Sequence, residues 1–163
     1  MNRNEYLTAI NEFWYQGEVF GEAVMNRWLQ LEKDPIRRWK WATIQQLETE
    51  TKARLRPFLM RLGLSIVAND VEDKVTEVSA GFADKSWSEI MEMGAEIAGT
   101  YLEKFLEIEA AAPESEREIA HSMVIHESSL LDFAKQELAG KSENSLDGVI
   151  PQLHWPIPRP QAG

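Results

Sequence analysis

Apolar residues recur along most of the chain at a spacing close to 3.6, which is the period of an α-helix. Glycine and proline are sparse until the C-terminal tail, and residues that favour helices dominate. The pattern predicts four long helices, at about residues 5–32, 35–62, 86–111 and 115–140. A more polar stretch between the second and third helices is expected to hold a short helix at about residues 70–79.

Local signals mark several helix ends. Asp34 and Pro35 form a good N-cap and a good first residue for the second helix. S-x-x-E motifs that begin at Ser86 and Ser115 predict capping boxes at the starts of the third and fourth helices. Pro57 lies inside the second apolar pattern, so we expect it to kink or shorten that helix.

Near-equal helices of roughly 36–42 Å suit a four-helix bundle. The first two helices, and the last two, are joined by only a few residues, which predicts two antiparallel hairpins. The link between the second and third helices, residues 64–85, is long enough to run the length of a bundle. The predicted fold is therefore all-α, a ferritin-like four-helix bundle with a long crossover between helices 2 and 3.

The chain changes character after Gly140. A polar KSENSLDG stretch leads into VIPQLHWPIPRPQAG, which holds four of the seven prolines and is expected to be extended. We therefore divide the chain into a bundle domain, 1–140, and a Pro-rich tail, 141–163. The tail should pack on the bundle or on a neighbouring subunit, because several of its side chains are too apolar for a free tail: Val149, Ile150, Leu153, Trp155 and Ile157.

Charge and composition exclude several classes of protein. The 17 Lys and Arg residues against 27 Asp and Glu residues give a net charge of −10, which argues against binding nucleic acid or anionic lipid. The absence of cysteine excludes disulfides, zinc fingers and thiolate chemistry. The N-terminus, MNRNEYLTAINEFW, lacks the apolar core of a signal peptide, and no apolar run could span a membrane, so we expect a cytoplasmic protein.

Three glutamates interrupt otherwise apolar helix faces. Glu18 shares a face with Trp14 and Trp28, and Glu48 and Glu127 lie within the apolar stripes of the second and fourth helices. All three are near the middle of their helices. Burying an unpaired carboxylate costs several kcal/mol, so something should compensate these charges.

The third helix offers two further acids, Glu92 and Glu96, of which one or both could turn inward. His126 borders the apolar face that contains Glu127 and could approach the core carboxylates from the side; a structural hydrogen bond is the simpler reading of it. Carboxylates that converge from four helices can hold two transition-metal ions, and imidazole is a common additional ligand of iron and manganese.

In helix order, crossover and acid positions, residues 5–139 resemble the ferritin-like superfamily, in particular the small rubrerythrin-type di-iron proteins. That family supplies glutamates from one helix of each pair and E-x-x-H motifs from the other. Glu18, Glu48 and Glu127 match its glutamates, whereas Thr51 and Leu130 stand where its histidines would be. The resemblance implies a centre of two iron or manganese ions, and an oxidoreductase that acts on oxygen, peroxide or a small organic substrate.

Other readings stay open at this point. A literal E-x-x-H motif joins Glu118 to His121, but Glu118 is explained by the second capping box and lies on the opposite helix face from Glu127. The acids could instead pair with Arg27, Arg37, Arg38, Arg54 or Arg56. A metal-free chain would be a helical interaction module that dimerises through an aromatic face or the tail. It could also be a small-molecule carrier with a Trp-lined pocket near Gly17 and Gly21. A homodimer is the expected assembly.

Overall fold

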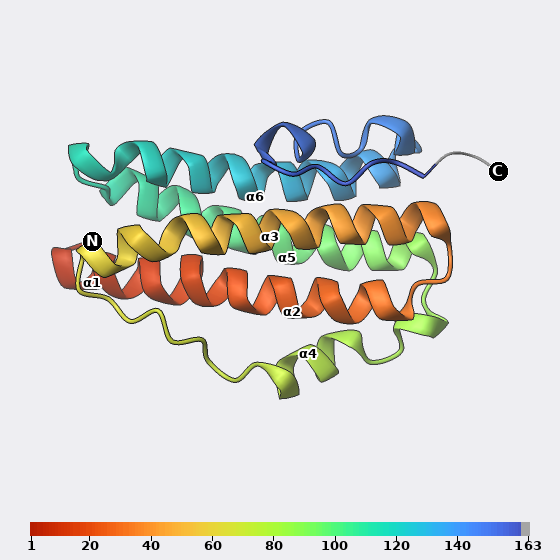
Figure 1. Ribbon diagram of the computed structural model, residues 1–163, viewed down its shortest axis with the longest axis horizontal. Coiled ribbons are helices and arrows are strands. Elements are labelled where there is room, and N and C mark those ends of the chain that lie inside the picture. Colours follow the sequence, from red (N-terminus) through yellow and green to blue (C-terminus); the bar gives the residue numbers. More distant parts are fainter. Residues whose placement is uncertain (161–163) are drawn as a thin grey trace.

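The computed structural model describes residues 1–160, which contain helices and turns but no strand (Figure 1). The prediction of an all-α fold is therefore confirmed. Residues 161–163, the end of the predicted tail, lie outside the described residues. The main helices are α1 (Arg3–Ala9), α2 (Gln16–Leu31), α3 (Pro35–Arg61), α4 (Glu72–Ser79), α5 (Trp87–Ala111) and α6 (Arg117–Leu138).

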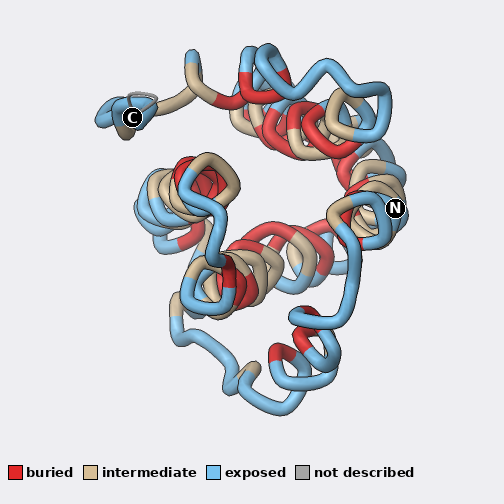
Figure 2. Tube along the Cα trace, turned by 90° about the vertical axis from the view of Figure 1, so that its right-hand side faces the viewer, coloured by how far each residue is buried: buried red, intermediate tan, exposed pale blue. Residues whose placement is uncertain are grey.

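The long helices lie side by side along the longest axis of the molecule (Figure 1). α2 packs against α3, and α5 packs against α6, each as an antiparallel pair. The segment between α3 and α5 carries α4 and runs back along the outside of α2 to the opposite end, as expected of a crossover (Figure 1). Viewed end-on, the buried positions of the long helices face the interior that they share (Figure 2). No helix within residues 1–160 is both long and apolar enough to cross a membrane.

Two of the three predicted helix starts are confirmed, and one is wrong. Asp34 Oδ1 accepts hydrogen bonds from the N–H groups of residues 36 and 37, and Ser86 forms the expected capping box with Glu89. The prediction at Ser115 is wrong, because residues 114–116 form a 3₁₀ turn and α6 begins after it without a side-chain cap. Pro57 does not shorten α3, which continues through it to Arg61.

The first predicted helix is interrupted by a π-helical segment, η1 (Ile10–Tyr15), which the sequence pattern did not indicate. A π-helical turn holds more residues than an α-helical one, and such turns are frequent at functional sites. Here Trp14 and Tyr15 are adjacent and both buried, and the Tyr15 hydroxyl donates a hydrogen bond of 2.7 Å to the carbonyl of Ile66 in the crossover. α2 follows directly and carries Glu18.

Residues 141–160 follow α6 and lie against the helices. They include two 3₁₀ turns, η4 (Ser142–Asn144) and η5 (Ile150–Gln152), so the segment is less extended than expected. Val149 is buried, and the indole N–H of Trp39 donates a hydrogen bond of 2.9 Å to the carbonyl of Ile157. Ile150, Leu153 and Ile157 are half-buried against the same apolar cluster as Val149.

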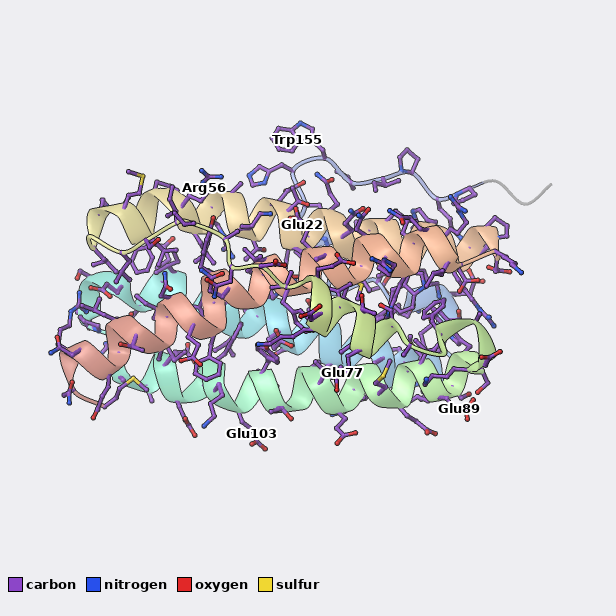
Figure 3. All side chains as sticks on the ribbon, turned by 90° about the horizontal axis from the view of Figure 1, so that it is seen from below. Glu22, Arg56, Glu77, Glu89, Glu103 and Trp155 are labelled. Carbon is purple, nitrogen blue, oxygen red and sulfur yellow. The ribbon has the colours of Figure 1, made fainter. Side chains whose placement is uncertain are left out.

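Trp155 differs from the expectation that the apolar side chains of the tail would be covered, because it is 73% exposed (Figure 3). The cause is local. Glu50 accepts hydrogen bonds from the backbone N–H groups of His154 and Trp155, at 2.7 and 3.3 Å, and from His154 Nδ1 at 3.0 Å. These contacts hold the backbone against α3 and leave the indole ring outside.

A buried ion pair fixes the end of the molecule opposite the N-terminus. Lys40 on α3 pairs with Glu137 on α6, and its ammonium group also reaches the Ser142 carbonyl at 2.7 Å and the Ser145 hydroxyl at 3.1 Å. Burial would raise the pKa of Glu137, but hydrogen bonds from Lys40 and from the indole N–H of Trp87 lower it overall. Every charged group of this pair therefore has a partner, as buried charges require.

Candidate metal centre

Three of the predicted glutamates and one histidine are buried in the interior shared by the long helices. Glu18 comes from the first turn of α2, Glu48 from the middle of α3, and His126 and Glu127 from the middle of α6. Their exposed fractions are 2%, 5%, 1% and 6%, respectively. The three helices therefore bring carboxylate and imidazole groups to one level, far from solvent.

Glu18, Glu48 and His126 are arranged as a possible set of ligands for a metal ion. His126 Nε2 lies 3.4 Å from Glu18 Oε1 and 3.8 Å from Glu48 Oε2. One ligand atom from each residue falls within 4.8 Å of the other two. A movement of less than about 2 Å per side chain would bring three such donors to the distances of about 2.0–2.2 Å that divalent transition metals require. The group could therefore hold a metal ion.

The imidazole of His126 is held on its other side by a threonine. Thr51 Oγ1 lies 3.2 Å from His126 Nδ1, and both groups are buried. A hydrogen bond from Nδ1–H to the hydroxyl leaves Nε2 as an unprotonated lone pair that faces the two carboxylates. Histidine ligands of metals are usually held in this way by a partner at the second ring nitrogen.

Gly21, on the next turn of α2 after Glu18, makes room for the second carboxylate. A Cβ atom built on Gly21 would lie 2.8 Å from both Cδ and Oε2 of Glu48 and 3.0 Å from Oε1. Only a residue without a side chain allows the Glu48 carboxyl group to lie there. The space needed by the Glu48 carboxyl group therefore explains why a glycine, which destabilises a helix interior, lies at this position.

The electrostatics of the cluster favour neutral groups when no cation is present. Burial, and then the charge of Glu48, raise the pKa values of Glu18 and Glu127 well above their ordinary range. Burial raises the pKa of Glu48 to about 7, and burial lowers the pKa of His126 to about 3. A metal ion would displace protons from the carboxyl groups and would bind the lone pair of the neutral imidazole directly.

No cationic side chain compensates these carboxylates directly. Among residues 1–160, no arginine forms an ion pair with Glu18, Glu48 or Glu127, although the charge of Arg54 does lower the pKa of Glu18. Glu18 Oε2 is buried and has no hydrogen-bond partner among the described residues. A bound cation would satisfy this oxygen, so the observed donor set fits a metal ion.

The structure does not bring the remaining candidates to this cluster. Glu92 and Glu96 are both exposed on α5, because they lie on the face of that helix turned away from the interior. Glu118 and His121 are exposed on α6, where His121 Nδ1 lies 2.8 Å from a carboxylate oxygen of Glu109. The alternative register based on these two residues therefore lies outside the interior.

Other polar residues named from the sequence have partners elsewhere. Glu22 pairs with Lys52 near the surface, and Arg27 pairs with Glu72 at 2.7 Å. Thr51 was expected to share a helix face with Glu48 and to stand in the place of a missing histidine, but its contact with His126 was not anticipated. Its position three residues after Glu48, on the same face of α3, was a signal that could have been used.

Comparison with protein families, curated proteins and solved structures finds no match to this chain. The function is therefore inferred from the geometry of Glu18, Glu48, His126 and Glu127 and from the chemistry of their donor atoms.

Proposed function

We propose that this protein binds a transition-metal ion, iron or manganese, through Glu18, Glu48 and His126. The observation that carries the proposal is the convergence of these three buried donors from three helices, with no Lys or Arg of residues 1–160 in an ion pair with Glu18 or Glu48. Carboxylate oxygen and imidazole nitrogen suit both metals. The order of the helices and the long crossover support a ferritin-like four-helix bundle as the scaffold.

The donor count favours one ion over the two expected from the resemblance. Ferritin-like di-metal centres use four glutamates and two histidines. The interior of this protein supplies three glutamates and one histidine, and the candidates for a fourth acid, Glu92 and Glu96, are exposed. Glu127 is the remaining carboxylate beside the proposed ion, where it balances charge or serves as a fourth ligand.

A redox-active ion at this position would supply electrons for a reaction with oxygen or peroxide, which makes an oxidoreductase the proposed class. The protein's own groups hold and orient the centre. Thr51 fixes the ring of His126, Gly21 admits the carboxyl group of Glu48, and the apolar interior keeps bulk water away. Exclusion of water strengthens every electrostatic interaction within such a site.

The proposal is tested by elemental analysis of the full-length protein after anaerobic loading with Fe²⁺ or Mn²⁺ and removal of free metal. We expect about one ion per chain, as the donor count predicts. Glu48→Ala should abolish binding, whereas Glu96→Ala removes an exposed glutamate of a long helix and should leave it unchanged. Equal metal content in the Glu48→Ala and native proteins, or none in either, would overturn the proposal.

A second candidate function, a helical module that dimerises through the tail, is favoured by the exposure of Trp155. This proposal predicts that the native protein sediments as a dimer and that Trp155→Ala sediments as a monomer. Leu106→Ala, on α5, removes an exposed apolar side chain elsewhere and is the matched control. A native protein that is monomeric at all concentrations would contradict it.

A further inference from the structure

A cavity of about 120 Å³ lies beside the glutamates of the candidate metal centre. Its walls come from α2, α3, α5 and α6, with Val78 of α4 at the edge. Glu18, Glu48 and Glu127 line one part of it and are the charged residues of its lining within residues 1–160. Aliphatic and aromatic side chains form nearly all of the remaining surface, including Val24, Trp28, Met91, Ile97 and Phe133.

The cavity opens between α2 and α5. Its lining residues on these two helices include half-buried side chains, Phe20 and Met25 on α2 and Ile97 and Tyr101 on α5, whereas Trp41 and Ile44 on α3 are buried. The two helices also carry glycines at the cavity. A Cβ atom built on Gly94 would meet no atom within 4 Å, so the space beside it is open.

Two tryptophans of the cavity wall have unused hydrogen-bond donors. The indole N–H groups of Trp28 and Trp41 are buried and have no partner among the described residues. Their rings are in edge contact, with centroids 5.0 Å apart. Buried donors are nearly always satisfied in native proteins, so these two donors in the cavity wall are available to an acceptor that enters the cavity.

Size and charge narrow the class of ligand. A dry apolar cavity of about 150 Å³ in another protein binds benzene or xenon, so this cavity suits a molecule of about six or seven heavy atoms. An anion would meet the carboxylates of the centre, and a strongly hydrated cation would lose its water against apolar walls. The lining therefore favours an uncharged molecule.

We propose that the cavity between α2 and α5 binds a small, uncharged, largely apolar molecule of about the size of benzene or phenol, carrying at most one hydrogen-bond acceptor. The acceptor is satisfied by the indole N–H of Trp28 or Trp41, and the apolar body lies beside Glu18, Glu48 and Glu127. Its role as the substrate of the centre rests on the proposed function, but its binding does not require a metal ion.

The test measures binding of three probes, benzene, phenol and benzoate, to the full-length protein by ligand-observed NMR, before and after metal loading. We expect benzene and phenol to bind, phenol more tightly, and benzoate at least about tenfold more weakly than phenol. Absence of benzene and phenol binding, or tighter binding of benzoate than phenol, would overturn the proposal.

A variant inside the cavity and a matched variant outside it show where the probe binds. Gly94→Leu fills the cavity and should weaken phenol binding at least about tenfold. Gly99→Leu is the control on the same helix, since a Cβ atom there also meets nothing within 4 Å but Gly99 does not line the cavity. Unchanged binding in Gly94→Leu would refute the location.

The double variant Trp28→Phe, Trp41→Phe tests the indole contact. It should reduce the affinity for phenol to that for benzene, and a phenol affinity that stays higher than the benzene affinity would refute the contact.

The two proposals fail in different ways. If the probes bind, Gly94→Leu prevents their binding and elemental analysis finds no metal, the cavity proposal is supported and the metal-binding proposal is refuted. If metal binds and no probe does, the metal centre stands and the cavity proposal falls. Circular dichroism of each variant confirms that its helices are intact.

Discussion

The hydroxyl group of Thr51 and the imidazole of His126 form a buried contact of 3.2 Å that joins α3 to α6. It turns the free ring nitrogen of His126 towards Glu18 and Glu48. The position that would hold a histidine in the family pattern therefore orients a histidine from another helix. The proposed donor set therefore takes its imidazole from position 126 of α6 rather than from position 51 of α3.

Replacing this hydroxyl should weaken metal binding without unfolding the protein. Partners at the second nitrogen of a metal-binding histidine contribute about 10–100-fold to affinity. We expect that loss for Thr51→Val, which keeps the shape of the side chain, and recovery for Thr51→Ser. Competition with a fluorescent chelator measures the affinity. Equal affinity in Thr51→Val would show that the contact does not position the ring.

The variant Gly21→Ala tests whether the absence of a side chain at position 21 is needed for Glu48 to bind metal. The new methyl group would displace the end of a flexible side chain rather than backbone, so the free energy of unfolding should change by less than about 1 kcal/mol. The carboxylate must move, however, and metal affinity should fall at least about tenfold. Gly99→Ala, where the added Cβ atom meets nothing within 4 Å, should leave metal affinity unchanged. A large loss of stability with intact affinity would contradict this reading.

The metal-free protein should lose stability as the pH rises through about 7. The raised pKa of Glu48, about 7 against an ordinary 4.5, means that its native form retains a proton that the unfolded chain has released. Its stabilising effect is complete below pH 4.5 and is lost as the pH rises through about 7. Glu18 and Glu127, whose pKa values are also raised, act in the same direction.

His126 has the opposite effect, because its pKa is lowered to about 3 and stability is lost as the pH falls below its ordinary 6.5. Above 6.5 only the carboxyl groups of the cluster contribute. We therefore expect the free energy of unfolding to fall by at least about 1 kcal/mol between about pH 6 and about pH 8. Urea titrations of chelator-treated protein measure it. Glu48→Gln should show a smaller decrease, and an unchanged slope in that variant would contradict the assignment.

Lys40→Met should be strongly destabilising, by about 3–5 kcal/mol, because it leaves the carboxylate of Glu137 buried without its charged partner. Adding Glu137→Leu removes that charge and should recover at least about half of the loss. Lys104→Met breaks an exposed pair with Glu107 and should cost less than about 1 kcal/mol. Urea unfolding compares the variants, and equal losses for the two lysines would show that burial does not govern them.

The sequence pattern predicted the features that depend on the helical period of apolar residues. The helix faces were visible as apolar stripes, and Glu18, Glu48 and Glu127 stood out because they interrupt those stripes. The acids of α5 could not be assigned in the same way. Glu92 borders the apolar face and Glu96 leans towards the polar side, and a rotation of the helix by part of a turn decides whether they face the interior or solvent.

Features that depend on distant contacts were not visible in the sequence. The π-helical segment Ile10–Tyr15 includes Tyr15, whose hydroxyl bonds to the carbonyl of Ile66 in the crossover, far from it along the chain. Ser115 matches a capping motif, but the neighbouring Glu116 is held by Arg3 at 2.8 Å and the backbone there forms a 3₁₀ turn instead. The exposure of Trp155 follows from the hydrogen bonds of Glu50, a residue on another element.

The crossover has a consequence for how the protein assembles. Each antiparallel helix pair closes through a short connection and can form from contacts that are local in the chain, which are made early in folding. The candidate centre joins both pairs, since Thr51 and His126 are 75 residues apart. An ion bound there would cross-link the two helix pairs only after they have packed together. It should therefore slow unfolding far more than it accelerates folding. The lifetime of the native state would then depend on metal supply, while the rate of its formation would not.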